Sequence, residues 1–438
     1  MDKKTKERID ALRIKSIPFG YVETPAGVLP NDWASKPLSE ISEVISEQAG
    51  DNDYETLSIS AGIGFVNQAQ KFGKELSGKQ YEKYTVLRKG DFAYNKGNSK
   101  LYPQGCTYRL KERDEAAVPN VFECFRIAEE CPEYYEQLFI NGFMNRQLMR
   151  KINHGVRDDG LLNLTFADFY STVLPVPPLA EQQKIAEILS TCDRVIELKQ
   201  QLLDEKHKQK QWLMQILLDP DSCVRLPGFE DSTWQTAAIS SLFTFGSSLA
   251  KSRDELSDEG DLYLHYGDIH ANSRYYIDAK AEYALIPKYD GTSLNKTHLR
   301  TGDVVFVDAS EDYEGISKFV VIENCDGFIF ISGLHTLPCH SRDDRLTLHF
   351  KRYCFQTYSF KKQMAFYANG MKVYGISEKD FEKIKISFSD HEEQTAIADV
   401  LDTISMNIEL LKNEIAEIAQ KKKALMQLLL TGLVRTNN

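Results

Sequence analysis

The sequence lacks a long hydrophobic run, a cysteine framework and any low-complexity tract. No segment holds 18 consecutive apolar residues, and residues 1–8 do not resemble the start of a secretory signal. The 8 cysteines include no CxxC pair, a pattern typical of a reducing cytoplasm and not of a disulfide-bonded secreted protein. We therefore expect a cytoplasmic protein that does not associate with a membrane.

The chain also lacks an excess of positive charge. The formal net charge is −11 at pH 7, whereas proteins that bind nucleic acids usually carry a basic surface. Residues 71–100 are an exception, because lysine and arginine clearly outnumber acidic residues there. This stretch is consistent with a local basic face and equally with an ordinary solvated surface.

Signatures of catalysis are incomplete. Residues 73–79 have the glycine and lysine spacing of a phosphate-binding loop, but Gln80 stands where Ser or Thr would hold magnesium. Gly62 and Gly64 form only a fragment of a dinucleotide fingerprint. The sequence also has no Asn/Asp-Pro-Pro-Tyr/Phe tetrapeptide, the pattern carried by adenine methyltransferases.

Two groups of residues resemble metal sites without matching their spacing. One group, which fits no structural zinc pattern, is Cys325, His335, Cys339 and His340. The other, which lacks the Glu-x-Lys spacing of metal-dependent nucleases, is Asp308, Glu311, Asp312, Glu314 and Lys318. We therefore expect no catalytic residue, no cofactor and no metal in this chain.

The most informative feature that is present is an internal duplication. The segment from Glu181 to Leu218 aligns without a gap with the segment from Glu393 to Leu430, at an offset of 212 residues. Both copies open with Glu-Gln-x-x-Ile-Ala-x-x-Leu and close with Leu-Met-Gln-x-Leu-Leu. A repeat of this length indicates two copies of one unit, and hence a target with two parts.

Both copies have the spacing of a coiled coil. In the second copy, two ladders repeat every seven residues and are offset by three: Leu401, Ile408, Ile415, Lys422, Leu429 and Ile404, Leu411, Ile418, Leu425. The first copy keeps the ladders with more polar positions, which predicts a looser or partner-covered stretch. About 38 residues give a helix of roughly 57 Å. Matched heptads favour an intramolecular pair over two separate surface helices.

The blocks around these helices also share motifs. Residues 87–92 match residues 299–304 at the same offset, and each Gly-Asp pair predicts a turn followed by a buried strand. Short β-type runs alternate with helical stretches such as 131–140, which predicts α+β blocks with a curved or barrel-like sheet. The expected divisions are a block at 1–175, a helix at 176–218, a block at 219–386 and a helix at 387–432.

This order of elements resembles the specificity subunit of type I restriction-modification systems, over essentially the whole chain. The resemblance implies two target-recognition domains that each recognise one half of a bipartite DNA sequence. It further implies that the two long helices pack as an antiparallel coiled coil, separate the domains with pseudo-two-fold symmetry and bind the methyltransferase subunits. The chain departs from the family pattern at residues 387–390, where Ser-Phe-Ser-Asp replaces the prolines that precede the first helix.

The resemblance implies double-stranded DNA and methyltransferase (modification) subunits as partners, with a motor and nuclease (restriction) subunit left open. Such partners would supply much of the phosphate contact that an acidic chain lacks. Two alternatives remain: a related subunit of a fused or variant phage-defence methyltransferase, and a duplicated scaffold that binds protein instead of DNA. If the chain is a DNA specificity subunit of either kind, a one-heptad insertion within 180–218 should lengthen the gap between half-sites without changing either half-site.

Base recognition requires amide, hydroxyl and cationic side chains on loops. In the first block the candidate DNA-binding residues are Asn67, Gln68, Gln70, Lys71, Asn95, Lys96, Asn98, Ser99 and Lys100. In the second block they are Asn272, Arg274, Ser310, Lys318 and His335. The candidate partner-binding residues lie at the two helix starts and are Glu181, Gln182, Glu393 and Gln394. An exposed polar loop or a solvated helix face would explain many of the same residues.

Overall fold

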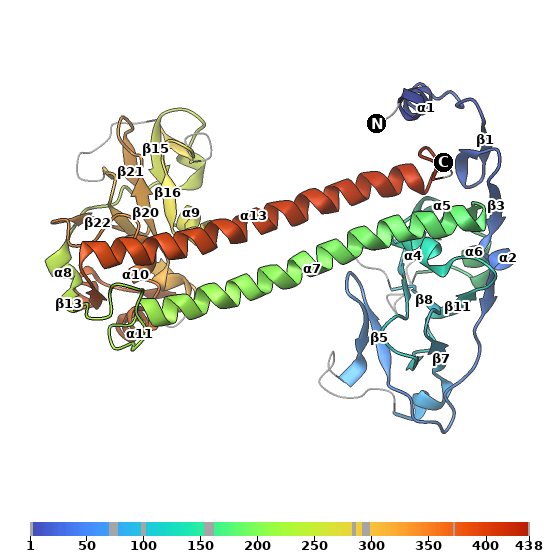
Figure 1. Cartoon of the computed structure of the whole chain (residues 1–438), viewed down its shortest axis with the longest axis horizontal. Helices are drawn as coiled ribbons and strands as arrows, with labels where there is room; N and C mark the ends of the chain where they lie inside the picture. Colours follow the sequence, from blue (N-terminus) through green and yellow to red (C-terminus); the bar gives the residue numbers. More distant parts are fainter. Residues whose placement is uncertain are drawn as a thin grey trace. The chain divides into compact units, whose positions relative to one another are not determined.

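The computed structural model describes residues 3–69, 78–97, 102–152, 162–282, 286–290, 298–370 and 373–436. The chain divides into two compact units: unit 1 comprises Met1–Gln200 and Asn413–Asn438, and unit 2 comprises Gln201–Lys412. The division cuts two long helices, α7 (Leu179–Leu217) and α13 (His391–Leu429), so each unit contains part of both (Figure 1). Each of these helices has 39 residues, which confirms the predicted pair of long repeat helices.

Unit 1 combines short helices with short strands. Its remaining helices are α1 (Lys3–Arg13), α2 (Leu38–Ile41), the 3-10 helix η1 (Gly78–Lys83), α4 (Pro132–Ile140), α5 (Asn145–Lys151) and α6 (Phe166–Tyr170). Its strands are β1 (Tyr21–Thr24), β2 (Gly27–Pro30), β3 (Ala34–Pro37), β4 (Ser42–Val44), β5 (Leu57–Ser60), β6 (Gly64–Asn67), β7 (Thr85–Arg88), β8 (Phe92–Asn95), β9 (Cys106–Arg109), β10 (Glu115–Val118), β11 (Glu123–Ile127) and β12 (Val173–Val176).

Unit 2 has the same mixed character. Its remaining helices are α8 (Ile239–Leu242), η2 (Arg253–Glu255), α9 (Tyr266–Ala271), η4 (Gly315–Ser317), α10 (Lys351–Cys354), α11 (Tyr358–Tyr367) and α12 (Glu378–Phe381). Its strands are β13 (Gln235–Ala238), β14 (Phe243–Phe245), β15 (Asp261–Leu264), β16 (Tyr276–Asp278), β17 (Lys288–Tyr289), β18 (Val304–Val307), β19 (Ala309–Ser310), β20 (Phe319–Glu323), β21 (Phe330–Ser332), β22 (Thr336–Ser341), β23 (Tyr374–Gly375) and β24 (Lys385–Phe388). The α+β prediction is therefore confirmed.

One sheet dominates each unit. In unit 1 it has the strand order β4-β11-β8-β9, and all its pairs are antiparallel. In unit 2 the order is β14-β22-β18-β20-β16, and β16 pairs with β20 in parallel while the other pairs are antiparallel. Strands β8 and β18 occupy matching central positions, in agreement with the matching motifs that precede them.

Both Gly-Asp motifs form the turn that the sequence predicts. Gly90 and Gly302 have φ values of 99° and 94°, which L side chains rarely adopt, so glycine is required at both positions. Asp91 accepts a hydrogen bond of 2.6 Å from the backbone N–H of Arg88, and Asp303 accepts one of 2.7 Å from Arg300. A buried strand follows each turn, as predicted.

The long helices belong to the cores of the units. In unit 1, Leu189 of α7 and Leu429 of α13 pack into the same buried cluster as Phe125 of the sheet. In unit 2, Leu217 of α7 and Leu401 of α13 pack with Phe306 of the sheet in the same way. Burial of apolar surface at about 25 cal/mol per Å² is the main force that fixes each pair of half-helices to its domain.

Within each unit the two helices run in opposite directions. In unit 1, Lys422 Nζ lies 2.5 Å from Asp193 Oδ1 and Lys199 Nζ lies 2.6 Å from Glu414 Oε2, so the later part of α13 meets the earlier part of α7. At the start of α13, Asp390 Oδ1 accepts a 2.9 Å hydrogen bond from the backbone N–H of Glu393 and so caps the helix. Within the described residues, no helix combines the length and hydropathy needed to cross a membrane.

Candidate nucleic-acid interface

The sheet of unit 2 gathers four of the five predicted DNA-binding positions at one edge. Strands β16 and β20 are parallel and both begin at this edge, directly after Tyr275 and Lys318. Strand β18 is antiparallel to β20 and ends there, shortly before Ser310, while β22 begins there, directly after His335. We name this edge the loop end and define it by Arg274, Ser310, Lys318 and His335.

Two cations at the loop end, the exposed Arg274 and the half-buried Lys318, lie against neighbouring tyrosines. The Arg274 guanidinium lies 5.0 Å from the centre of the Tyr276 ring, and Lys318 Nζ lies 5.4 Å from the centre of the Tyr275 ring. Arg274 also forms an ion pair with Glu282. Stacking on a ring limits the conformational freedom of a long cationic side chain, so both cations are already positioned to bind an anion.

His335 is also exposed at the loop end. Its φ of 55° places it in the left-handed region, and half of its side chain is exposed. The imidazole Nδ1 lies 3.3 Å from Asp308 Oδ1, and the ring meets the edge of Tyr266 at a centroid distance of 5.6 Å. A histidine and a carboxylate side by side offer both a donor and an acceptor to the edge of a base.

The two other predicted residues of unit 2 have structural contacts. Asn272 Oδ1 accepts hydrogen bonds from the backbone N–H groups of Arg274 and Tyr275 at 2.8 and 2.9 Å, and its Nδ2 donates to the carbonyl of Tyr276 at 3.0 Å. Ser310 is buried and accepts a 3.4 Å hydrogen bond from the N–H of Asp312. These two residues shape the loops, whereas Arg274 and His335 are exposed and Lys318 is half-buried.

In unit 1 the predicted residues that the structure describes are engaged inside the chain. Lys96 Nζ lies 3.1 Å from Glu123 Oε1 and 4.1 Å from the centre of the Phe166 ring. Burial raises the pKa of Glu123, and Lys96 opposes that effect. Asn95 accepts a 2.8 Å hydrogen bond from the N–H of Gly97, so it forms a turn at the end of β8.

Asn67 and Gln68 lie at the end of β6, in a different part of unit 1. Asn67 Nδ2 donates to Glu55 at 3.0 Å, and the buried Gln68 donates to the hydroxyl of Tyr84 at 3.3 Å. The remaining predicted residues of unit 1 lie outside the described residues: Gln70, Lys71, Asn98, Ser99 and Lys100. Most of the phosphate-loop pattern at 73–79 lies outside them as well.

The four residues predicted to bind a partner have internal contacts instead. Glu181, Gln182, Glu393 and Gln394 are buried, with at most 1% of each exposed. Gln182 accepts a hydrogen bond of 3.1 Å from the backbone N–H of Cys131, and Gln394 accepts one of 2.8 Å from Thr347. Each glutamine also donates to a carbonyl just before its own helix. The expected partner contact is therefore replaced by a structural role at each helix start.

Glu181 receives contacts from two separate segments of unit 1. Its carboxylate accepts hydrogen bonds of 2.9 Å from the indole Nε1 of Trp33 and from Nε and Nη2 of Arg435. In unit 2, Arg225 Nε lies 4.0 Å from the Glu393 carboxylate and its guanidinium lies 5.3 Å from the centre of the Trp234 ring, but the Trp234 indole N–H has no hydrogen-bond partner among the described residues. Arg435 has no counterpart at the repeat offset, where the sequence has Cys223.

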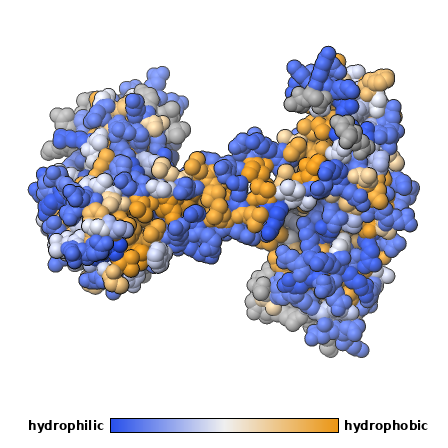
Figure 2. Space-filling view, viewed as in Figure 1, coloured by the Kyte–Doolittle hydropathy of each residue, from blue (hydrophilic) through white to orange (hydrophobic). Residues whose placement is uncertain are grey.

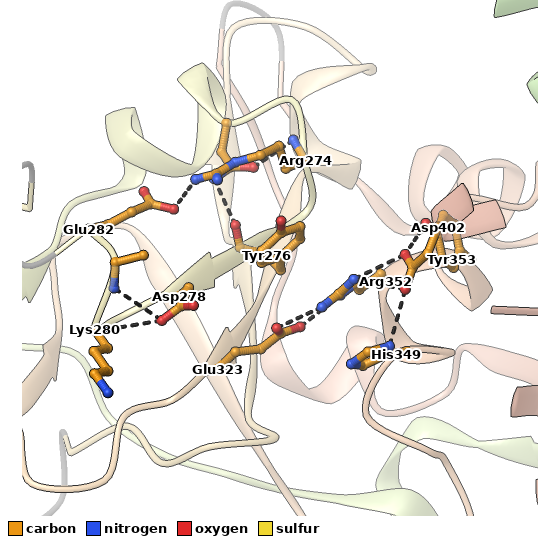
Figure 3. A network of polar contacts seen from close by, with 12 residues as sticks. Arg274, Tyr276, Asp278, Lys280, Glu282, Glu323, His349, Arg352, Tyr353 and Asp402 are labelled. Atoms are coloured by element: carbon orange, nitrogen blue, oxygen red, sulfur yellow. Dashed lines mark hydrogen bonds and ion pairs between the residues drawn. The ribbon is translucent and has the colours of Figure 1, made fainter. Parts of the chain in front are cut away.

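The edge of the unit 2 sheet opposite the loop end holds a network of charged side chains, which could not be found from sequence motifs (Figure 3). We name it the helix end and define it by Glu323, Arg352 and Asp402. Arg352 of α10 joins Glu323 at the end of β20 to Asp402 of α13. Among the described residues, no cluster of histidine, cysteine and acidic side chains is suited to hold a metal ion.

Solved structures share the arrangement of duplicated α+β domains with long helices. A chain from a study of complex assembly and conformational transition in a type I restriction-modification system has a TM-score of 0.55 and 16% identity, covering 93% of this chain and 99% of that one. A type I restriction-modification S subunit from M. genitalium has a TM-score of 0.54 and 12% identity, covering 93% and 98%. These similarities establish the fold.

Sequence comparison identifies the family. Residues 30–205 and 231–420 both match the family described as "Type I restriction modification DNA specificity domain", so the chain belongs to this family and contains two copies of its domain. A relative from Methanocaldococcus jannaschii, provisionally named the type I restriction enzyme MjaX specificity subunit, is 24% identical over 95% of this chain and 96% of its own length. The MjaVIII specificity subunit from the same organism is 24% identical over 62% of this chain and 64% of its own length.

Proposed function

We propose that this chain gives a type I restriction-modification complex its DNA sequence specificity. The observation that carries the proposal is the presence of two matched specificity domains in one chain. The chain itself acts without catalysis and directs partner subunits to a bipartite DNA target. One domain recognises each half of the target, and the base pairs between the half-sites are not contacted.

The loop end is the surface that we propose for DNA contact in unit 2. Arg274 and Lys318 suit backbone phosphates, because both are cations supported by aromatic rings, and Arg274 is exposed while Lys318 is half-buried. His335 and Asp308 suit a base edge, since one donates and the other accepts a hydrogen bond. By analogy we propose that the loop after β8, beginning at Lys96, makes the equivalent contact in unit 1, because β8 and β18 occupy matching positions.

The long helices are the surface that we propose for the methyltransferase subunits. Large apolar side chains on them are exposed by 37–61%: Val195, Leu198, Leu202, Met406 and Leu410. Leu198 and Leu410 stand at the repeat offset, so each unit presents one copy of this position. Figure 2 shows hydrophobic residues along these helices. This matched position supports two methyltransferase chains for each specificity chain, one on each unit.

A groove within unit 2 adds to this surface. It encloses about 370 Å³ between the two helices and is lined by Lys206, Gln209, Leu213, Asp399, Val400, Thr403, Ile404 and Asn407. The groove has an apolar floor with a polar rim, as expected where an amphipathic helix of a partner binds. Whether a restriction subunit also joins the complex is a separate matter, which co-purification of the partner chains decides.

A genome-wide map of adenine methylation tests the proposal. The host is compared with and without this gene, with the partner genes expressed in both strains. We expect one bipartite, gapped motif to lose its methylation when the gene is deleted, and the motif gives the target sequence. If every methylated motif survives the deletion, the specificity role is wrong and a scaffold that binds protein becomes the better explanation.

A further inference from the structure

The sheet of unit 2 connects the proposed DNA-contact surface to helix α13. The loop end lies where β20 begins, and Glu323 is the last residue of the same strand. Strand β20 spans five residues, so the two ends are about 13 Å apart. Any contact that fixes Glu323 therefore also fixes the position of Lys318, which directly precedes the strand.

Arg352 makes this contact through two parallel hydrogen bonds. Its Nε and Nη2 donate to the two carboxylate oxygens of Glu323 at 2.7 Å each. Both side chains are almost fully buried, with 11% of Arg352 and 8% of Glu323 exposed. A buried bidentate pair has one favourable geometry, because the planar guanidinium and the carboxylate must be coplanar.

The same guanidinium binds helix α13. Its Nη1 lies 3.0 Å from both carboxylate oxygens of Asp402. Asp402 also accepts a hydrogen bond of 2.5 Å from the Tyr353 hydroxyl, and His349 Nδ1 lies 3.1 Å from it. Arg352 thus connects the strand that leads to the loop end with the helix that bears the proposed partner surface.

An aromatic ring extends this connection towards Arg274. The Arg352 guanidinium lies 4.0 Å from the centre of the Tyr276 ring, and the Arg274 guanidinium lies 5.0 Å from the same centre. Figure 3 shows Tyr276 between the two arginines. The exposed charge of Arg274 and the buried charge of Arg352 therefore share one support at the start of β16.

Unit 1 has the same arrangement without a buried arginine. The glutamines at the helix starts bind Cys131 and Thr347, which makes Glu136 the counterpart of Arg352 and Gln137 the counterpart of Tyr353. Glu136 accepts from Arg109 Nε at 3.0 Å, and Lys111 Nζ lies 2.5 Å from it. The polarity of the pair is thus the reverse of that in unit 2.

The attachment to the helix differs accordingly. In unit 1, Gln137 donates a single 3.0 Å hydrogen bond to Asp193 of α7. The position on α7 that corresponds to Asp402 by the repeat offset is Ser190, whose hydroxyl donates to its own helix. Only in unit 2, among the described residues, does a buried arginine join the sheet to the long helix, with a bidentate pair to Glu323 and a bifurcated bond from Nη1 to Asp402.

We propose that Arg352 is a positioning residue that fixes the DNA-contact edge of unit 2 relative to helix α13, and so fixes the spacing that the complex accepts between its half-sites. This inference rests on the proposed function. The two units differ in this respect. The Arg352–Asp402 pair positions the DNA-contact edge that binds the second half-site, whereas the edge that binds the first half-site is positioned without it.

Asp402 is the better residue to change. Loss of Arg352 would leave the buried Glu323 and the half-buried Asp402 without their shared cation, which is strongly destabilising in general. Asp402→Ser places on α13 the residue that α7 already has, and Arg352 keeps its bidentate bond to Glu323. Asp402→Asn is a milder second variant that retains an acceptor for Tyr353. Glu409→Gln is the control, because it removes an exposed carboxylate from the same helix.

The test uses the complex of the full chain with its methyltransferase subunits. Methylation rates are measured on three duplexes that share both half-sites, with the natural gap or with one base pair more or fewer. We expect Asp402→Ser to reduce the preference for the natural gap by about tenfold, the effect of one weakened position on DNA discrimination. Glu409→Gln should leave the preference unchanged.

The ratio of rates separates positioning from a merely structural role. If Asp402→Ser and Asp402→Asn fold and slow all three duplexes equally, or leave the ratio as it is, the inference is wrong. If Asp402→Ser does not fold, the ratio for Asp402→Asn decides. If the wild-type complex methylates none of the gapped duplexes, the proposed function itself fails and the inference falls with it.

Discussion

Arg435, beyond the end of α13, binds Glu181 at the start of α7 with two hydrogen bonds of 2.9 Å. The same guanidinium donates to both oxygens of Asp32, at 2.9 and 2.6 Å. Three segments of unit 1 that are far apart in sequence therefore meet at one charge. This contact attaches the end of one long helix to the beginning of the other, within a single unit.

Glu181→Gln should destabilise the protein more than Glu393→Gln. The first change removes charge-assisted hydrogen bonds to Arg435 and weakens the bond from Trp33, at a cost of about 2 kcal/mol. The second removes a carboxylate whose ion pair with Arg225 is 4.0 Å long, so the cost should be smaller than that of losing charge-assisted hydrogen bonds of 2.9 Å. Thermal unfolding of both variants measures the difference. Equal losses would contradict the view that the two helix starts are held with unequal strength.

On acidification, wild type should lose stability more steeply than a variant that lacks Arg435. Burial raises the pKa of Glu181, but bonds from Arg435, Trp33 and Thr436 outweigh it, so the pKa lies below its ordinary value of 4.5. The pKa of Asp32 is lowered mainly by its hydrogen bond to Arg435. A carboxylate with a lowered pKa stabilises the fold above its ordinary pKa, and this contribution is lost as pH falls through the lowered value.

Thermal unfolding of wild type and Arg435→Met between pH 7 and pH 3 tests this prediction. Wild type should be the more stable protein at pH 7, and its advantage should shrink below about pH 4.5. An advantage that stays constant across the range would show that the Arg435 contact does not depend on ionised Glu181 and Asp32.

The sequence predicted the long helices well because their pattern is local and repeated. Leu401, Ile404 and Ile408 occupy consecutive ladder positions, and all three are buried. The turns before β8 and β18 were predicted for the same reason, since a Gly-Asp pair before an apolar run requires only neighbouring residues. These features depend on short-range geometry, which a sequence shows directly.

The contacts of Glu181 and Gln182 could not be predicted, although both residues were singled out. A polar residue at a helix start is usually solvated, and nothing local distinguishes it from one that is buried by distant segments. The partner Arg435 lies 254 residues from Glu181, and the repeat offset places Cys223, not an arginine, at its counterpart. The network of Arg352 was missed for the same physical reason.

Lys422 occupies a ladder position of α13, and Lys210 is its counterpart on α7 at the repeat offset. Their substitution should change the free energy of unfolding in opposite directions. Lys422 is buried and lies 2.5 Å from Asp193, so Lys422→Met should cost about 1 kcal/mol. Burial lowers the pKa of Lys210, which rests 5.7 Å from the centre of the Tyr353 ring. Lys210→Met should therefore be neutral or stabilise by up to about 1 kcal/mol, since it removes a desolvated charge and keeps the ring contact.

Denaturant unfolding of the two variants measures these changes. The midpoint should move down for Lys422→Met and stay or move up for Lys210→Met, with the same slope in both. A loss of stability in Lys210→Met as large as that in Lys422→Met would show that the charge of Lys210 is satisfied within unit 2.

Arg274→Ala and Lys318→Ala should each weaken DNA binding and reduce its salt dependence. If both side chains bind phosphates, each substitution lowers the slope of log affinity against log salt by about 1 and affects all sequences alike. Lys361→Ala is the control, because it removes an exposed lysine of α11 that is not one of the residues that define the loop end. Binding titrations of the complex at several salt concentrations give the slopes. Unchanged slopes in both variants would remove the loop end from the DNA interface.

A matched heptad inserted into both long helices should lengthen the gap of the DNA target. Seven residues add about 10.5 Å to a helix and keep the heptad phase, which corresponds to about three base pairs at 3.4 Å each. The insertions belong after Gln200 in α7 and after Lys412 in α13, where the two units divide. A change in α7 alone would leave its new residues without an antiparallel partner.

A methylation map of a strain that carries the double insertion measures the result. Both half-sites should be retained, because every domain residue is unchanged, and only the number of bases between them should increase. A four-residue insertion at the same two sites is the control, since it breaks the phase of the apolar ladders and should destabilise the helix pair. A heptad variant that methylates the original gap would show that helix length does not set the spacing, and altered half-sites would show that the helices also shape the recognition surfaces.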